Sequence, residues 1–316
     1  MREFDLIKQR LALLSGYSGA EGLSDDVSLV PVSSAQQIIT TDTLAEGVHF
    51  FSDDPLFTVG QKLVRVNVSD CLAKGALPKF ALFNLTWPRS RTDAELSQLI
   101  DGLGTDFHSF KIDLIGGDTT ASEREIVLSL TLIGEAANAR IVRRSSAKVD
   151  EDVWVTGLIG CGALGLAARR ELGPAQEDHR VAPYLVPELP RLSTASLIGE
   201  YASASADVSD GLLADLGHIA DASGAGIECH LSDIPLVENA EFGLLELDLL
   251  TGGDDYQTVF TAPVSAREAI ERDARTYGQA VSRIGRVTVG QGVRLIGSDG
   301  MPIKVLKSGW QHQTSS

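Results

Sequence analysis

The sequence is poor in cysteine and has no long apolar run. Its three cysteines, Cys71, Cys161 and Cys229, are odd in number and widely spaced in apolar surroundings. This pattern favours reduced thiols over a disulfide framework or a zinc site. No apolar run reaches the roughly 20 residues of a membrane helix, and the amino terminus lacks the residue order of a signal peptide. We therefore expect a cytoplasmic protein with no membrane partner.

Basic residues are also scarce. The 316-residue chain has 27 Lys and Arg against 43 Asp and Glu, which gives a formal charge of −16 at pH 7. Nonspecific nucleic-acid binding draws its affinity from basic residues that neutralise phosphates, so this balance argues against a nucleic-acid partner. A phosphorylated substrate would need a metal ion to be held here. Excess acid by itself is equally consistent with a role in solubility.

Two common phosphate-binding signatures are missing from the sequence. It contains no Gly-x-x-x-x-Gly-Lys-[Ser/Thr] motif and no glycine-rich kinase loop with its partner motifs. Any ATP chemistry therefore requires a different architecture.

Length and apolar periodicity predict two domains that mix helices and strands. The polar and basic stretch 143–152 separates two runs of alternating elements. We expect an α/β protein with mixed sheets, with one domain over 1–147 and a second over 148–316. The segment 173–191 contains four prolines and is predicted to be a long exposed connection.

Local patterns place two of the acidic residues. Apolar residues at helical intervals predict a helix over 58–73, which puts Asp70 in its last turns. A strand over 112–115 is predicted to end in a turn at Gly116 and Gly117, where Asp118 could bind metal beside backbone N–H groups that face phosphate.

What the chain has in excess is aspartate beside small or hydroxyl-bearing residues. Small neighbours let a ligand approach the backbone closely, and hydroxyl groups add neutral oxygen ligands. Gathered in one cleft, such segments would bind hard cations, and a polyphosphate is the natural co-ligand if the cation is Mg²⁺. The segments are Asp25-Asp26, Thr40–Thr43, Ser69-Asp70, Gly116–Thr120, Asp207–Gly211 and Gly252–Asp255.

Each segment also has a purely structural explanation. A Gly-Gly-Asp run is a common turn, and Ser209 or Asp210 could simply cap the helix that follows. Asp42 could end a strand, and Asp70 could be a partly exposed polar residue late in a helix. The functional interpretation depends on the set, because six such segments occur over both halves of a chain that lacks the common catalytic signatures.

Taken in order, these segments resemble the motifs of thiamine-monophosphate kinases, and the order and spacing hold over nearly the whole chain. The resemblance implies the two-domain fold of aminoimidazole ribonucleotide synthetase, and a homodimer formed through the N-terminal domain. It also implies phosphorylation of thiamine monophosphate to thiamine diphosphate by ATP. The matching runs are Asp25-Asp26, Thr41–Leu44, Glu46–Phe50, Asn67–Asp70, Gly116–Thr120, Arg144-Ser145, Asp207–Leu212 and Gly253–Tyr256.

The resemblance also implies individual roles. Several Mg²⁺ ions would be held by Asp26, Thr40, Thr41, Asp42, Asp70, Asp118, Asp207 and Asp210. The ATP site would be lined by Gly117, Asp118, Arg144 and Ser209. Asp210 and Arg144 would be the catalytic residues. Thiamine monophosphate would contact His49, Asp254 and Trp310, and an aromatic face suits a cationic thiazolium ring. The first domain would bind ATP and Mg²⁺, the second would complete the active site, and transfer would be direct and in line.

Three departures from the family pattern stand out. Ser24 replaces a glycine before the first aspartate pair, and Lys74 replaces a methionine. The segment from Asp254 to Thr258 replaces Glu-Asp-Tyr-Glu-Leu, which shortens a substrate-contacting glutamate by one methylene group and neutralises a second acid at Gln257.

Other functions remain open at this point. Selenophosphate synthetase needs a reactive amino-terminal cysteine, whereas the first cysteine here is Cys71. The run from Asp42 to His49 disfavours aminoimidazole ribonucleotide synthetase. The hydrogenase-maturation carbamoyl dehydratase is another ATP user of the same superfamily. A cation-binding protein that kept the fold but lost catalysis is allowed by the altered segment after Asp254.

Overall fold

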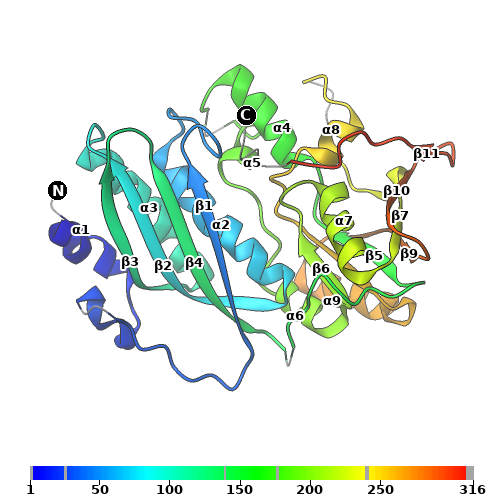
Figure 1. The fold of residues 1–316 in the computed structure, drawn as a ribbon, viewed down its shortest axis with the longest axis horizontal. Helices are drawn as coiled ribbons and strands as arrows, with labels where there is room; N and C mark the ends of the chain where they lie inside the picture. The colour runs from blue at the N-terminus through cyan, green and yellow to red at the C-terminus, as the bar shows by residue number, and fades with distance from the viewer. Residues whose placement is uncertain (1–2, 25–26, 139, 176–177, 239–241, 311–316) are drawn as a thin grey trace. The chain divides into compact units, whose positions relative to one another are not determined.

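The structure, a computed structural model, describes residues 3–24, 27–138, 140–175, 178–238 and 242–310. The chain forms two compact units, each with its own sheet (Figure 1). Unit 1 consists of Met1–Cys71 and Leu77–Ala136, and unit 2 consists of Leu72–Ala76 and Ala137–Ser316. The functional division after residue 147 stays a prediction.

Unit 1 is built on a four-stranded sheet in the order β1, β4, β2, β3. Strands β1 (Gln37–Ala45) and β4 (Val127–Ala136) are antiparallel, whereas β2 (Ala76–Pro88) and β3 (Asp113–Ser122) are parallel. The sheet is therefore mixed, as predicted. Alternate side chains of β4 are buried on one face because helices cover that face.

The two long helices of unit 1 are α2 (Leu56–Ala73) and α3 (Asp93–Phe110). They approach each other through glycine, since a Cβ atom at Gly102 would lie 1.9 Å from the carbonyl oxygen of Phe57. The predicted helix over 58–73 is confirmed, and Asp70 lies in its last turn. The chain begins with α1 (Glu3–Gln9), η1 (Leu11–Leu14) and η2 (Ser18–Leu23).

The turn predicted at Gly116 and Gly117 is wrong. Strand β3 continues through both glycines and through Asp118 to Ser122. Gly117 has a φ of +151°, and a Cβ atom there would lie 1.8 Å from the carbonyl oxygen of Phe83 on the neighbouring strand. Glycine is therefore required for close contact within the sheet rather than for a turn.

Unit 2 is built on a seven-stranded sheet in the order β11, β10, β7, β9, β5, β8, β6. Only β10 and β7 are paired in parallel among the strand pairs described. The strands are β5 (Asp152–Thr156), β6 (Ala204–Asp207), β7 (Gly226–His230), β8 (Thr258–Ala262), β9 (Val281–Thr288), β10 (Gly292–Ile296) and β11 (Pro302–Ile303). The helical elements are α4 (Cys161–Leu172), α5 (Ala182–Leu185), α6 (Thr194–Tyr201), α7 (Leu212–Ser223), η3 (Leu231–Asp233), α8 (Glu246–Thr251), η4 (Val264–Ala266) and α9 (Arg267–Tyr277).

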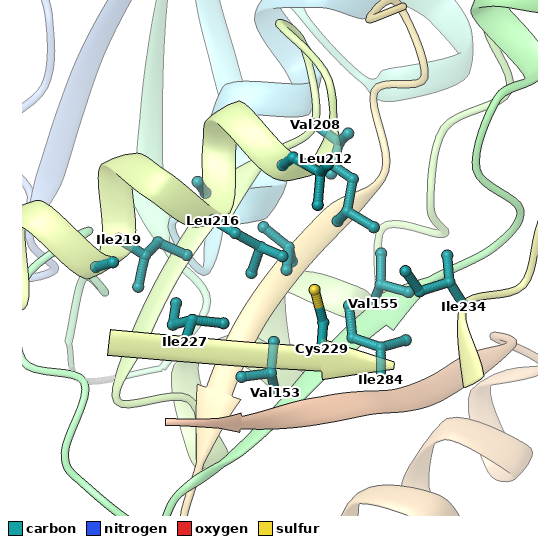
Figure 2. Packing of buried hydrophobic residues seen from close by; sticks show 14 of the residues in the cluster. Val153, Val155, Val208, Leu212, Leu216, Ile219, Ile227, Cys229, Ile234 and Ile284 are labelled. Carbon is teal, nitrogen blue, oxygen red and sulfur yellow. The ribbon is translucent and has the colours of Figure 1, made fainter. Parts of the chain in front are cut away.

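Every position of β5 and β8 is buried, because both faces of the sheet are covered at these two strands. Val153 and Val155 of β5 pack into the core under α7, whereas Trp154 between them packs into the core with α6 and α9 residues. Along α7, Leu212, Leu216 and Ile219 face the sheet at helical spacing (Figure 2). This packing fixes where α7 begins, directly after the loop that carries Ser209 and Asp210.

Two further expectations can be compared with the structure. Cys71, Cys161 and Cys229 are all free thiols, as predicted. The segment 173–191 is less exposed than predicted, because it contains α5 and buries Val181 and Tyr184. Within the described residues, no helix is both long enough and apolar enough to span a bilayer.

Candidate active site

Unit 1 brings together three of the predicted metal ligands. Thr40 and Asp42 lie two residues apart on β1 and share one face of the strand, and Thr40 donates a hydrogen bond from Oγ1 to the Asp70 carboxylate on α2. Burial, followed by the negative charge of Asp70, raises the pKa of Asp42 to about 7. Two carboxylates and a hydroxyl group thus converge, and a bound cation would offset the repulsion between the carboxylates.

Thr41 and His49 take different positions around this cluster. Thr41 is exposed and lies opposite Thr131, whose hydroxyl group is 3.2 Å from its own. Strand alternation therefore directs the Thr41 side chain away from the face that carries Asp42. His49 follows β1, and its Nδ1 accepts the backbone N–H of Ala45 at 3.0 Å. The neutral ring consequently carries its proton on Nε2.

Asp118 lies apart from the Asp42 cluster. It is exposed on β3, in register with the exposed Asn84, whereas Asp42 on β1 is in register with the buried Leu130. Two strands separate β1 from β3 in the sheet order, which corresponds to about 14 Å across the sheet. Among the predicted metal ligands of unit 1, Thr40, Asp42 and Asp70 therefore form one cluster, and Asp118 lies at a separate position. Asp26 lies outside the described residues.

In unit 2, the predicted residues at 207–211 form a loop between β6 and α7. Asp207 ends β6 and is 4% exposed, while Ser209 and Asp210 are half-buried at the loop surface. Gly211 precedes α7 with a φ of +119°, a conformation that favours glycine. The side chains of Ser209 and Asp210 do not cap α7, so the structural explanation by helix capping is wrong for both.

Two distant segments are bound to the carbonyl groups of this loop. The backbone N–H of Asp254 donates to Ser209 O at 2.9 Å, and the N–H of Trp310 donates to Asp210 O at 2.9 Å. Asp254 and Tyr256 both have a positive φ, at 61° and 50°. This is a strained backbone of the kind that concentrates at functional sites. Unit 2 therefore brings together residues that are predicted to bind metal, nucleotide and substrate.

Cationic groups accompany the loop. Arg144 is exposed and close enough to Asp215 for its charge to oppose the rise in the pKa of that carboxyl group. Trp310 is 50% exposed, and Lys307 Nζ lies 5.6 Å from the centre of its ring. The indole face is thus already placed where it attracts a cation.

Two buried aspartates were not assigned roles from the sequence. Asp255 accepts the N–H groups of Gly160 and Gly162 at 2.9–3.0 Å, so it holds the amino terminus of α4. Burial raises its pKa to about 7. Asp215 is buried on α7, where burial and then the charge of Asp210 raise its pKa to about 7. An acid within an otherwise apolar helix face is the sequence signal that could have identified Asp215.

One histidine was also overlooked. Among the described residues, Asp210, Asp215 and His218 each offer a ligand atom within 4.8 Å of the others. His218 lies on α7, one turn after Asp215, and its Nε2 is 4.0 Å from Asp210 Oδ2. Helical folding brings this imidazole to the loop, which sequence spacing alone did not indicate.

Gln257, the neutral departure after Asp254, has a structural role. Its Oε1 accepts the Thr156 hydroxyl group at 2.9 Å, and its Nε2 donates to Glu188 O at 2.8 Å. It is 7% exposed. The neutral side chain at this position therefore lies in the protein interior rather than at the surface of the loop.

The comparisons with known proteins first define a class. The model of the AIR synthase related protein N-terminal domain matches residues 24–136, and that of the AIR synthase related protein C-terminal domain matches residues 148–298. The chain is thus a two-domain protein of the AIR synthase related class, which confirms the predicted fold.

Individual relatives narrow the assignment. Thiamine-monophosphate kinase of Caulobacter vibrioides is 35% identical, with 98% of this chain and 90% of the relative covered. The crystal structure of thiamine-monophosphate kinase from Stenotrophomonas maltophilia is 33% identical, with a TM-score of 0.83 and 95% and 97% of the two chains covered. A structure of AaThiL complexed with AMPPCP and TMP is 33% identical, with a TM-score of 0.78 and 99% of each chain covered. The chain belongs to the thiamine-monophosphate kinase family.

Proposed function

We propose that this protein phosphorylates thiamine monophosphate with ATP and releases thiamine diphosphate and ADP. Its family membership supports this reaction, as does the relative AaThiL, which was solved with the ATP analogue AMPPCP and with TMP. The main structural support for the proposal comes from the loop between β6 and α7 in unit 2. Its Ser209 and Asp210 carbonyl groups hold the backbone of Asp254 and Trp310, so nucleotide, metal and substrate residues share one framework.

The residues present fit several Mg²⁺ ions. Thr40, Asp42 and Asp70 provide only oxygen ligands, and burial, followed by the negative charge of Asp70, raises the pKa of Asp42. Asp207 and Asp210 would provide further oxygen ligands in unit 2. We keep Asp26, Thr41 and Asp118 as proposed ligands on the family pattern. Bound Mg²⁺ would neutralise the two phosphate groups and so reduce their repulsion.

Transfer is proposed to be direct and in line. A terminal phosphate oxygen of thiamine monophosphate forms the new bond to the γ-phosphorus, while the bond from that phosphorus to the β,γ-bridging oxygen breaks and ADP leaves. A phosphate monoester is already largely ionised near neutral pH, so no strong base is needed. Arg144 adds fixed positive charge, and Ser209 and Gly117 line the nucleotide.

Thiamine monophosphate is proposed to contact His49, Asp254 and Trp310. The exposed indole face of Trp310 already attracts the ammonium group of Lys307, and a thiazolium cation offers the same electrostatic complement. The Tyr256 hydroxyl group donates to Asp254 Oδ1 at 2.9 Å and so fixes the direction of that carboxylate.

We also propose that the protein is a cytoplasmic homodimer. Support for self-association comes from unit 1, where Ile39 of edge strand β1 is 71% exposed on the sheet face opposite the helices. A strand at the edge of a sheet also presents backbone N–H and C=O groups that can pair with another chain.

The variant Asp210→Asn tests the proposed reaction. We expect turnover to fall about 100-fold or more at saturating Mg²⁺, because the neutral amide is a weak ligand for a hard cation. The thermal midpoint should change little, since Asp210 is only half-buried. Thiamine diphosphate formation is measured with ATP and thiamine monophosphate.

Asp221→Asn is the matched control, because Asp221 is an exposed aspartate on the helix that follows the loop. It removes one negative charge and should leave turnover unchanged. Near-wild-type turnover of Asp210→Asn at saturating Mg²⁺ would refute its role. ATP binding by the wild-type protein without any product would instead support a cation-binding protein that has lost catalysis.

A further inference from the structure

The loop of residues 208–211 in unit 2, termed here the metal loop, is fixed through its backbone. Val208 O, Ser209 O and Asp210 O accept the N–H groups of Tyr256, Asp254 and Trp310 at 2.8–2.9 Å. All three bonds connect the loop to segments far away in the sequence. The carbonyl side of the metal loop is therefore engaged by the two segments proposed to contact thiamine monophosphate.

On the N–H side of the metal loop, the Val208 N–H donates to Gln257 O at 2.8 Å, and one buried side chain accepts the next two N–H groups. Asp215 Oδ2 accepts the backbone N–H of Ser209 at 3.1 Å and that of Asp210 at 3.2 Å. The Asp215 side chain is completely buried, and its Oδ1 has no hydrogen-bond partner among the described residues. Burying a carboxylate with only half of its hydrogen-bonding capacity used costs free energy.

Helix capping does not account for this arrangement. Residues that cap a helix bind the N–H groups of its own first turn, whereas Ser209 and Asp210 both precede Gly211, the residue before α7. Asp215 lies inside α7 and reaches back to the loop. The buried acid thus shapes the metal loop rather than the helix terminus.

Two glycines allow neighbouring segments to lie close against the metal loop. A Cβ atom at Gly309 would lie 2.5 Å from Asp210 O and 2.5 Å from Ala214 Cβ. A Cβ atom at Gly253, which has a φ of +74°, would lie 2.5 Å from Ser209 O. A change in the loop backbone would therefore move the segments that carry Asp254 and Trp310 as well.

We infer that Asp215 is a positioning residue for phosphoryl transfer. By accepting the N–H groups of Ser209 and Asp210, it fixes the position of the Asp210 carboxylate that would bind a cation. Through the carbonyl groups of the metal loop, it also fixes the positions of Asp254 and Trp310, which would contact the substrate. The inference rests on the proposed function for its catalytic consequence. Its structural part, the order of the metal loop, can be measured independently.

The experiment compares Asp215→Ala with Asp215→Asn. Alanine removes the acceptor, and we expect kcat to fall about 30-fold and the Mg²⁺ concentration for half-maximal activity to rise several-fold, because small misplacements in an active site have large effects on rate. The asparagine side-chain oxygen can still accept both N–H groups, so Asp215→Asn should recover most of the lost kcat. Amide hydrogen exchange of residues 208–212 should accelerate only in the alanine variant.

Asp152→Ala is the control for general destabilisation. Asp152 is likewise buried in unit 2, where it pairs with Arg267, but it lies at the opposite end of β8 from Asp207. We expect a lower thermal midpoint for this variant with unchanged kcat, Mg²⁺ dependence and exchange of residues 208–212.

The outcomes separate the two hypotheses. If the wild-type protein forms no thiamine diphosphate, the proposed function fails, and the exchange data still decide whether Asp215 orders the loop. Unchanged exchange of residues 208–212 in Asp215→Ala would overturn the positioning role. It would also be overturned by a loss of kcat in Asp215→Ala no larger than in Asp152→Ala at temperatures where both are folded.

Discussion

At the scale of single residues, three helices of this protein end in the same left-handed conformation with different residues. Lys111 follows α3 with a φ of 58° and a ψ of 49°, while Gly224 and Gly278 follow α7 and α9 in the same region. A side chain in this region is strained by contact between Cβ and the backbone, which glycine avoids. The carboxyl-terminal end of α3 is therefore less stable with lysine at position 111 than it would be with glycine.

We predict that Lys111→Gly raises the free energy of unfolding by about 0.5–1 kcal/mol. The measurement is urea denaturation with the slope of the transition compared between proteins. Gly224→Ala is the reverse control, because a Cβ atom at Gly224 would meet nothing within 4 Å and only the backbone conformation is tested. It should lower stability by a similar amount. A less stable Lys111→Gly protein would contradict this prediction.

Residue-scale environment also separates neighbours that look alike in sequence. Asp254 lies at the surface of the metal loop, whereas Asp255 is 3% exposed and accepts the N–H groups at the start of α4. Adjacent residues face different surroundings because the chain turns sharply at Asp254 and Tyr256, both with positive φ. An acidic pair in sequence therefore need not be a pair in function.

At the scale of elements, α3 has a well-formed amino terminus. Thr92 and Glu95 form a reciprocal capping box, and Arg91 donates to Glu95 Oε1 at 2.8 Å. The backbone N–H of Thr92, followed by Arg91, lowers the pKa of Glu95 to about 2. Because the pKa is lowered on folding, the ionised carboxylate contributes stability above pH 4.5, and this contribution is lost as pH falls towards 2.

We predict that Glu95→Gln destabilises the protein by a few tenths of a kcal/mol at pH 6. Glutamine keeps the acceptor of the capping box but lacks the charge that pairs with Arg91. The difference from wild type should shrink as pH is lowered from 5 to 3, measured by urea denaturation at each pH. A difference that stays constant over this range would show that the charge contributes nothing.

Local sequence patterns predicted some helices and strands of this protein correctly and others incorrectly. Helix α2 follows its apolar periodicity, because one face packs on the sheet and the pattern records that packing. Strand β3 was predicted to stop at Gly116, because glycine usually marks turns. Contact with Phe83 on a neighbouring strand decides otherwise, and no local pattern contains that information.

At the scale of the whole molecule, the charge of −16 and the Asp42 cluster lead us to expect that divalent cations stabilise the folded protein. A ligand that binds only the folded state stabilises it by mass action. The pKa of Asp42 is raised to about 7 without metal, so below pH 7 a proton competes with the cation. Apparent cation affinity should therefore fall as pH decreases through 7.

We predict that 10 mM MgCl₂, about the millimolar range of weak oxygen-ligand sites, raises the thermal midpoint more at pH 8 than at pH 6. Asp42→Asn should reduce the shift and remove its pH dependence, because the titrating ligand is gone. Potassium chloride of equal ionic strength is the control for screening. An equal shift with potassium chloride would show that no specific cation site exists in the metal-free protein.

The sequence by itself determined the chemistry available to this protein: an acidic chain, oxygen ligands beside small residues, free thiols and a family pattern that covers nearly its full length. These properties are written in residue types and spacing, which physical chemistry constrains directly. Only the tertiary structure decided which aspartates meet. It joined Asp42 to Asp70, separated Asp118 by two strands, and buried Asp215 behind the metal loop. Such contacts depend on strand order and helix packing, which bring together residues that no local pattern connects.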